Sequence, residues 1–164
     1  MVIILLQKTK DKRIKGLWRY VSFNILNKFK ANIKYNWIGN LAFYASKGDA
    51  GIVANIYYGL HEFNESMFIL HYLREKDVFL DIGANVGHYS LLASGIKNCH
   101  SISIEPVPST FKRLNEQVIL NKLEDKITTL NIGIANKSSE LNFSVDKKTM
   151  NRIFSLLIKV MLFF

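Results

Sequence analysis

The chain has 164 residues and a formal net charge of +9 at pH 7, and 49% of its residues are hydrophobic. This length and composition predict one domain with a packed core and exclude a largely disordered chain. The single cysteine, Cys99, excludes an internal disulfide and fits a reducing compartment. The apolar start, Met1 to Leu6, is too short for an export signal, and no apolar run reaches the ~18 residues of a membrane span. We therefore expect a cytoplasmic protein.

The positive charge is concentrated in the first 34 residues, which hold nine Lys or Arg and one acid and therefore contribute +8 of the +9. This predicts a basic N-terminal segment over residues 1–36, separate from the domain that follows. Apolar residues recur in it at helical spacing, at Ile14, Leu17, Trp18, Val21, Ile25 and Phe29. The helix could lie on an anionic membrane surface through residues 12–30, which would place the protein at a membrane. It could also pack on its own domain, which is the favoured interpretation.

The segments before the main motif have weaker patterns. Residues 33–44 predict either a strand pair or an irregular cover. Residues 46–51 have the composition of a turn, and residues 52–58 alternate loosely, which predicts a short strand ending at Gly59. A shared apolar face predicts a helix from about residue 64 to residue 73.

A strand, a glycine turn and the start of a helix follow one another from Val78 to Leu92. Residues 78–82 are apolar except for Asp81, and they predict a buried strand. We place Asp81 at the carboxyl end of this strand, because an unpaired buried carboxylate costs free energy and open α/β sheets bind ligands at that end. The helix is expected to run to about Ser94, with Gly95 as its C-cap.

The following segments repeat the order of strand and helix. Residues 101–105 alternate and predict a second strand, and Pro108 suits the first turn of the next helix. Residues 127–134 predict a third strand, and residues 141–145 predict a return strand that forms a hairpin with it. Residues 153–164 are almost entirely apolar, and their relation to the sheet is obscure. This order predicts an α/β fold.

The glycine spacing separates two kinds of nucleotide site. The dinucleotide fingerprint is G-x-G-x-x-G, whereas here Asn85 stands two residues after Gly83. The pattern Asp81-x-Gly83-x-x-x-Gly87 fits a ligand without a pyrophosphate, such as S-adenosylmethionine (SAM), whose amine Asp81 can meet. Glu105 ends the second strand, beside the end of the first, where a carboxylate can accept the ribose hydroxyls of SAM or NAD alike.

Residues 78–92, 103–111 and 114–121 resemble the FkbM-like SAM-dependent methyltransferase family. The most specific feature is the order Asp-x-Gly-Ala-Asn-x-Gly followed by Glu-Pro-x-Pro, and residues 55–63 also resemble one branch of the family. The resemblance covers residues 37–153 and implies a Rossmann-like class I methyltransferase fold, of which the chain holds the N-terminal half of the sheet. It also implies methylation of a hydroxyl on a sugar, glycan or secondary metabolite. We therefore expect a small-molecule or glycan acceptor and no nucleic acid.

The resemblance implies a role for each residue of the motif. The residues that would hold the methionine part of SAM are Asp81, Gly83, Asn85 and Gly87. Glu105 would hold the ribose, and Asn131, at the end of the third strand, would lie near the adenine. No metal site is expected.

The chain departs from that family after residue 153. Family members continue into a fourth strand with a Lys-Ile-Asp-x-Glu-Gly type motif, which this chain lacks, and residues 154–164 form an aberrant apolar tail instead. The hypothesis is a truncated or frameshifted chain with an incomplete domain over residues 37–153, an unpaired edge on its first strand, weak SAM binding and little or no turnover.

A hydroxyl acceptor would benefit from a general base. The candidates are His88, beside the glycine turn, and the pair His61 and Glu62, although a structural role is the favoured interpretation of each. Three alternatives stay open: a nicotinamide oxidoreductase, a nucleic-acid methyltransferase that uses the basic N-terminus, and a non-catalytic SAM- or nucleoside-binding module.

Overall fold

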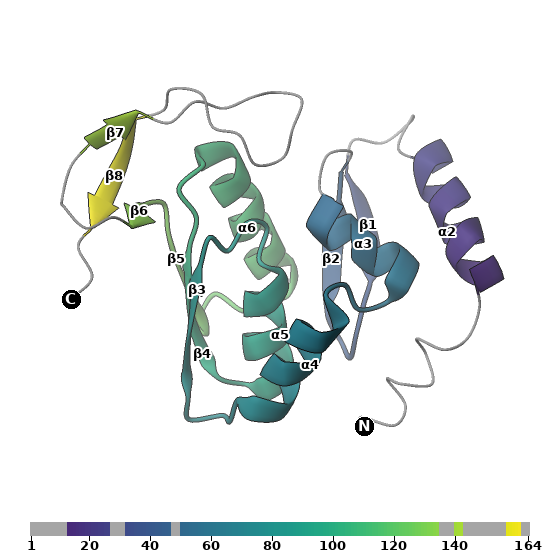
Figure 1. Ribbon diagram of the computed structural model, residues 1–164, viewed down its shortest axis with the longest axis horizontal. Coiled ribbons are helices and arrows are strands. Elements are labelled where there is room, and N and C mark those ends of the chain that lie inside the picture. The colour runs from purple at the N-terminus through teal and green to yellow at the C-terminus, as the bar shows by residue number, and fades with distance from the viewer. Residues whose placement is uncertain (1–12, 27–31, 47–49, 135–139, 143–156, 162–164) are drawn as a thin grey trace. The chain divides into compact units, whose positions relative to one another are not determined.

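The computed structural model describes residues 13–26, 32–46, 50–134, 140–142 and 157–161 (Figure 1). The chain forms two compact units, Met1–Phe68 and Ile69–Phe164. The domain boundaries predicted at residues 36 and 153 stay predictions. Within the described ranges, no helix is both long enough and apolar enough to cross a membrane.

The first unit contains helix α2 (Arg13–Leu26), strands β1 (Ile33–Asn36) and β2 (Ala42–Ala45), and helix α3 (Ala50–Tyr58). The two strands pair antiparallel, with Ile33 opposite Ala45. This confirms the strand pair among the two interpretations of residues 33–44. The core of the unit includes Phe43 and Ile52, which are fully buried.

Among its described side chains, helix α2 buries a residue that lies outside the predicted apolar stripe. Trp18, Val21 and Ile25 belong to the predicted apolar stripe but are exposed, Trp18 by 72%. Phe23 is buried instead, with its ring centroid 6.0 Å from that of Tyr35 and 6.4 Å from that of Tyr57. The prediction failed because helical spacing identifies apolar positions, whereas the aromatic partners that cover one of them come from β1 and α3.

Residues 50–58 form a helix, so the strand predicted over residues 52–58 is wrong. The five residues from Ile52 to Ile56 are all buried, and such an unbroken run has no period that separates a helix from a strand. Gly59 ends the helix with a φ of 79°, and its N–H donates to the Asn55 carbonyl at 2.9 Å. The glycine therefore terminates a helix in the left-handed region, where a side chain would be strained.

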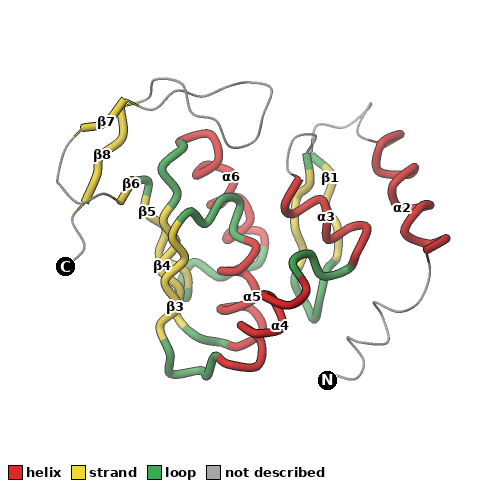
Figure 2. Tube along the Cα trace, in the orientation of Figure 1, coloured by secondary structure: helices red, strands yellow, loops and turns green. Residues whose placement is uncertain are grey.

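Helix α4 (Phe63–Tyr72) runs from the first unit into the second and confirms the helix predicted over residues 64–73. The second unit continues with β3 (Val78–Ile82), α5 (His88–Lys97), β4 (His100–Ile104), α6 (Pro108–Leu120) and β5 (Ile127–Leu130). The strands form a parallel sheet in the order β3-β4-β5, which Figure 2 shows in yellow beside the red helices. This confirms the predicted α/β Rossmann-like fold.

Helices α5 and α6 cover the same face of this sheet (Figures 1 and 2). On that face Asp81, Ser103 and Thr129 lie side by side in one row of the strand register. Ser90 of α5 bonds to Asp81, and Asn115 of α6 accepts a hydrogen bond from Thr129 at 2.7 Å. The interface between helices and sheet is therefore polar along this row.

The opposite face of β3 is apolar and exposed. Val78, Leu80 and Ile82 point to that face and are 64%, 39% and 59% exposed. Strand β3 also lies at the edge of the sheet, since only β4 pairs with it among the described residues. Within the described ranges, the outer side of β3 therefore has no paired strand.

Two local predictions in the second unit are wrong. Helix α5 runs past Gly95 to Lys97, and its C-cap is Asn98, which has a φ of 64° and donates its N–H to the Ala93 carbonyl. Asparagine tolerates this conformation almost as glycine does, so either residue could have ended the helix.

The predicted hairpin of residues 127–134 and 141–145 does not form. Strands β6 (Gly133–Ile134) and β7 (Glu140–Asn142) do not pair with each other, because β8 (Leu157–Met161) lies between them, parallel to β6 and antiparallel to β7. The other residues of that predicted return strand, 143–145, lie outside the described residues.

Candidate functional site

The loop from β3 to α5 follows the first parallel strand. Three of its residues have positive φ angles: Gly83 at 77°, Asn85 at 50° and Gly87 at 90°. The N–H groups of Gly83 and Ala84 both donate to the Ile104 carbonyl at 2.9 Å, which ties the start of the loop to the end of β4. The loop is therefore a fixed turn at the carboxyl ends of two neighbouring strands.

The two glycines of this loop have different surroundings. A Cβ atom on Gly87 would lie 2.7 Å from Cδ1 of the buried Leu114, so Gly87 lets α6 pack closely against the loop. A Cβ atom on Gly83 would meet nothing within 4 Å. Open space above a left-handed glycine is where a ligand can approach the backbone, so Gly83 borders the candidate ligand space.

Asp81 lies at the fourth position of β3 and is only 7% exposed. Its Oδ2 accepts a hydrogen bond from the Ser90 hydroxyl of α5 at 2.5 Å. Burial raises the pKa of the Asp81 carboxyl, and the bonds from the Ser90 hydroxyl and backbone N–H oppose that rise. Asp81 is thus a desolvated carboxylate, held by its neighbours, that a cationic group would stabilise.

Glu105 follows the last residue of β4 and is 6% exposed. Its Oε2 accepts the Asn85 N–H and its Oε1 accepts the Val107 N–H, each at 2.9 Å. Burial raises the pKa of Glu105, the two backbone bonds oppose this, and the negative charge of Asp81 adds to it. The side chain therefore joins the glycine loop to the start of α6, and each carboxylate oxygen keeps acceptor capacity for a ligand.

Asn131 lies just after β5, at the same end of the sheet. Its side-chain amide donates to the backbone carbonyls of Glu105, at 2.7 Å, and of Pro106, at 3.0 Å. The sequence-predicted residues Asp81, Gly83, Glu105 and Asn131 therefore share one edge of the sheet. Their assignment as binding residues stays a prediction.

Two further side chains of this site were missed by the sequence analysis. Ser90 and Ser103 are fully buried, and their hydroxyl oxygens lie 2.6 Å apart. Their spacing held a usable signal, because Ser90 and Ser94 stand four apart on a helix and Ser101 and Ser103 stand two apart on a strand. Each pair lies on one face of its element, where the two faces can meet.

The three catalytic candidates fall in different units. His88 begins α5 directly after Gly87, in the unit that carries the glycine loop, and its ring centroid lies 4.8 Å from that of Tyr89. His61 and Glu62 lie in the first unit, with 3.8 Å between Nε2 and Oε1. A catalytic role of any of them stays a prediction.

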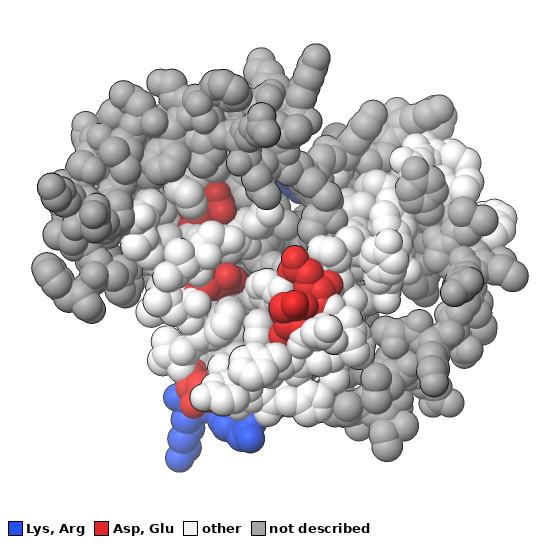
Figure 3. Space-filling view, in the orientation of Figure 1, with Lys and Arg blue, Asp and Glu red and all other residues white. Residues whose placement is uncertain are grey.

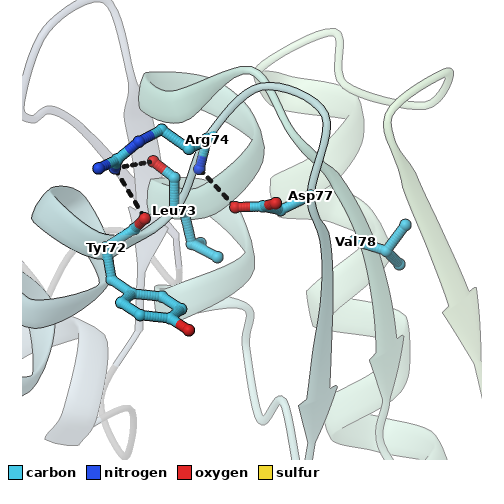
Figure 4. A pocket seen from close by; sticks show the side chains of 5 residues that line it. All are labelled: Tyr72, Leu73, Arg74, Asp77 and Val78. Carbon is cyan, nitrogen blue, oxygen red and sulfur yellow. Dashed lines mark hydrogen bonds between the residues drawn. The ribbon is translucent and has the colours of Figure 1, made fainter.

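A pocket of about 480 Å³ lies at the other end of the sheet, where α4 leads into β3 (Figure 4). The Arg74 guanidinium donates to the Tyr72 carbonyl at 2.7 Å and to the Leu73 carbonyl at 3.2 Å, and the Arg74 N–H donates to Asp77 at 2.7 Å. These bonds cap the end of α4 and shape one wall of the pocket. The pocket lies at the start of β3, so it is separate from the site at Asp81 and Glu105.

Charged side chains are unevenly placed over the part of the second unit that Figure 3 draws. Figure 3 shows Lys and Arg side chains gathered at the lower end of the drawn face, where Figure 1 places the turn from α4 into β3. The strand ends that carry Asp81 and Glu105 lie opposite. Among the described residues, no group of three or more His, Cys, Asp or Glu could hold a metal ion.

The family model of the TRM5/TYW2 methyltransferase domain matches residues 51–158. A tRNA(Phe) (4-demethylwyosine(37)-C(7)) aminocarboxypropyltransferase from Pyrococcus horikoshii is 31% identical over 80 residues, which are 49% of this chain and 29% of that protein. A tRNA (guanine(37)-N(1))-methyltransferase from Dictyostelium discoideum is 31% identical over 68 residues, which are 42% of this chain and 15% of that protein. The chain therefore matches less than a third of each of these relatives.

A crystal structure of P. horikoshii TYW2 in complex with MeSAdo has a TM-score of 0.50 and 19% sequence identity to this chain. The similarity covers 73% of this chain and 48% of that chain. At this level of identity the likeness supports the fold, and it agrees with the class I methyltransferase fold predicted from the sequence.

The relatives correct the predicted partner. Both are named as enzymes that act on tRNA, which contradicts the expectation of a small-molecule or glycan acceptor and no nucleic acid. That expectation followed from the FkbM-like resemblance, with further support from the basic charge lying outside the domain with the glycine turn. The inference was unsound, because phosphates can be bound by any segment that reaches them, and the long-range field of a basic segment also attracts a polyanion.

The predicted cofactor is confirmed, since the matching family is a family of SAM-dependent methyltransferase domains. The sequence predicted a SAM-dependent methyltransferase correctly, but the FkbM-like family was wrong. The motif Asp-x-Gly-x-Asn-x-Gly with a downstream acid describes how a cofactor is held, and it does not determine which acceptor is used. The matching residues make up more than half of the chain, which therefore belongs to the TRM5/TYW2 methyltransferase domain family.

Proposed function

We propose that this chain is the SAM-binding part of an enzyme that transfers a group from SAM to a tRNA. The observation that carries the proposal is the pair of buried carboxylates, Asp81 and Glu105, at the ends of adjacent parallel strands. Both lie within the residues that match the family. A tRNA acceptor is supported by the names of the two relatives.

The proposed cofactor site assigns each carboxylate to one part of SAM. Asp81 binds the amine of the methionine part, since burial makes an unpaired negative charge unfavourable there and a cation relieves it. Gly83 and Asn85 form the turn over which the methionine part lies, and Gly87 holds that turn against α6. Glu105 accepts the ribose hydroxyls, and Asn131 holds the strand ends beside the adenine.

The proposed acceptor is the nucleotide at position 37 of a tRNA, which both relatives carry in their names. When bound, SAM supplies an electrophilic carbon beside its sulfonium, either in the methyl group or in the aminocarboxypropyl group. The chain's own residues bind the cofactor and exclude water, and His88 is the candidate in the same unit for removing a proton from the acceptor. The family model favours methyl transfer, whereas the Pyrococcus relative is named for aminocarboxypropyl transfer.

A double-label experiment tests both parts of the proposal. The chain is incubated with tRNA and with SAM that carries tritium in the methyl group and carbon-14 in the carboxyl group. We expect tritium in the tRNA if methyl is transferred and carbon-14 if aminocarboxypropyl is transferred. A transcript changed at nucleotide 37 is the matched control for the acceptor, and it should take up neither label.

Asp81→Ala is the matched variant for the cofactor, and calorimetry should find its SAM affinity reduced at least about tenfold, because a charge-assisted bond is lost. Equal heats of SAM binding for the wild type and this variant would contradict the proposed site. If SAM binds and neither label reaches tRNA, the chain is a non-catalytic SAM-binding module, and the transferase proposal is wrong.

A further inference from the structure

We infer that Ser90 and Ser103 are positioning residues of the cofactor site, whose hydroxyls form a buried chain that aims the Asp81 carboxylate at the amine of SAM. The inference rests on the proposed function, which places that amine at Asp81. It adds a second layer to the site, on α5 and β4, which does not touch the cofactor itself.

Three groups from three elements form this chain. The Ser90 hydroxyl of α5 lies 2.5 Å from Oδ2 of Asp81 on β3, and 2.6 Å from the Ser103 hydroxyl on β4. Ser90 and Ser103 are both 0% exposed, so water does not compete for these bonds. Asp81 and Ser103 are also direct partners in the strand register, which fixes the separation between the two ends of the chain.

Counting donors gives the chain a direction. An ionised carboxylate only accepts hydrogen bonds, so Ser90 must donate its single O–H to Asp81. The Ser90 oxygen is then an acceptor toward Ser103, and Ser103 donates its O–H to it. The two hydroxyl groups therefore donate one after the other toward the Asp81 charge, and each hydrogen bond strengthens the other in a site of low dielectric constant.

The Ser90 hydroxyl fixes one oxygen of Asp81, and the carboxylate keeps acceptor capacity for a ligand. Oδ2 is held by the Ser90 hydroxyl, and the Ser90 N–H also bonds to the carboxylate. The carboxylate therefore cannot rotate freely, and its orientation is set before the cofactor arrives.

The same helix and strand contain a matched pair without a carboxylate. Ser94 of α5 and Ser101 of β4 are 2% and 1% exposed, and their hydroxyl oxygens lie 2.7 Å apart. This pair joins α5 to β4 one helical turn further on. Replacing Ser94 therefore removes a buried hydroxyl bond between the same two elements and leaves Asp81 untouched.

The experiment measures two ligands on three proteins by calorimetry. SAM carries the amine that Asp81 would bind, whereas methylthioadenosine has the same nucleoside and lacks the amino-acid part. For Ser90→Ala we expect about tenfold weaker SAM binding and unchanged methylthioadenosine binding, because a bond to a charged group is lost. For Ser94→Ala we expect both affinities to stay at the wild-type level. A Ser90→Ala variant that loses affinity for both ligands equally, or for neither, would overturn the inference.

A second measurement needs no ligand and stands even if the proposed function fails. The carbon-13 resonance of the Asp81 carboxyl is followed against pH, and its midpoint should move to higher pH in Ser90→Ala and less far in Ser103→Ala. These variants keep every other titratable residue on the elements packed against Asp81. Those residues are His88, Tyr89, Lys97, His100 and Glu105.

The Ser94→Ala variant should keep the wild-type midpoint. If Ser90→Ala keeps it too, the hydroxyl chain does not act on Asp81 and the inference is wrong. If Asp81→Ala loses SAM binding and Ser90→Ala keeps the wild-type titration midpoint, the role of the two serine hydroxyls is refuted and the proposed function is not. If the titration midpoint moves in Ser90→Ala and the protein binds no SAM, the proposed function is refuted and the role of the two serine hydroxyls is not.

Discussion

At the scale of single residues, two carboxylates share a buried edge of the sheet. Asp81 and Glu105 are each less than 10% exposed, and the charge of one raises the pKa of the other. Buried like charges oppose folding, and hydrogen bonds from Ser90, Asn85 and Val107 offset part of that cost. The two carboxylates therefore lower the stability of the ligand-free protein. A bound ligand that carries a cation and hydroxyl groups would restore it.

The pH dependence of Asp81 follows from this cost. Its folded-state pKa lies above the ordinary value, so the folded protein binds more protons than the unfolded one in the window between the two values. The free energy of unfolding should therefore fall as pH rises through that window, and in Asp81→Asn this part of the fall should be absent. SAM affinity should change in the opposite sense, rising with pH in the wild type and staying low and flat in the variant.

Urea unfolding and calorimetry from about pH 4 to about pH 8 would measure both quantities. Glu105 is present in both proteins, so the difference between them reports mainly on Asp81. If the free energy of unfolding of Asp81→Asn follows the same pH curve as that of the wild type, the destabilisation assigned to the buried Asp81 carboxylate is contradicted.

The two loop glycines should separate stability from binding. Gly87→Ala adds a left-handed alanine and a clash with Leu114, so we expect a loss of about 2–4 kcal/mol in the free energy of unfolding. Gly83→Ala adds only the backbone strain, about 1–2 kcal/mol. Its methyl group, however, enters the open space beside the loop. For the same loss in the free energy of unfolding, Gly83→Ala should therefore lower SAM affinity more than Gly87→Ala does.

Urea denaturation gives the first quantity and calorimetry the second. The two variants control for each other, because Gly83 and Gly87 have similar φ angles of 77° and 90° and differ in what surrounds them. Equal loss of stability at the two positions would show that the contact with Leu114 relaxes at no cost.

At the scale of elements, α2 shows how packing selects a helix face. Phe23→Ala removes a buried ring that lies against Tyr35 and Tyr57, so we expect about 3 kcal/mol of destabilisation. Trp18→Ala removes a larger ring that is 72% exposed, and it should change stability by less than about 0.5 kcal/mol. Urea unfolding of the two variants decides which face is the core, and a reversed order would restore the face predicted from the sequence.

The elements that position the site were predictable because each has a local signal. Strand β3 is an apolar run, β4 alternates, and Pro108 begins α6 at the residue where its fixed φ suits a helix. The place of Asp81 and Glu105 followed from the rule that parallel strands end at one edge. Where the signal was ambiguous, as in the unbroken buried run of α3, or where distant segments decide, as with β8 between β6 and β7, local patterns were insufficient.

The finer parts of the site were less predictable for a related reason. The bond from Glu105 to the Asn85 N–H joins residues 20 apart, and it depends on a left-handed asparagine whose conformation no local rule requires. The serine chain depends on the register of two strands and the rotation of a helix. Spacing can thus identify the charged groups, whereas their hydrogen-bond partners follow from the packing.

At the scale of the whole molecule, the parallel sheet of the second unit has helices on one face and exposed apolar side chains of β3 on the other. The helices lie on the side of Asp81, and the other side exposes Val78, Leu80 and Ile82 on an edge strand. Exposed apolar side chains on an edge strand favour association with another strand or polypeptide segment. The chain matches less than a third of each of the two curated relatives, and the activity of the whole enzyme stays a proposal.

The charge of the whole molecule gives a test of the tRNA partner. The first 34 residues contribute +8 of the net +9, so a polyanion that binds the chain should interact strongly with them. Each Lys or Arg that neutralises a phosphate steepens the fall of log affinity with log salt by about 0.7–0.9. We therefore expect tRNA binding to weaken steeply with salt, and replacement of Lys8, Lys10, Lys12 and Lys15 by Gln to make that dependence shallower.

Filter binding of labelled tRNA across a salt series measures the slope. The matched control replaces four lysines of the second unit, Lys76, Lys97, Lys122 and Lys126, which gives the same change in net charge at other positions. SAM affinity should be the same in both variants, because neither set includes a residue assigned to the cofactor site. A smaller slope in the N-terminal variant alone would assign the phosphate contacts to that segment, whereas equal slopes in all three proteins would show that these lysines do not contact the tRNA.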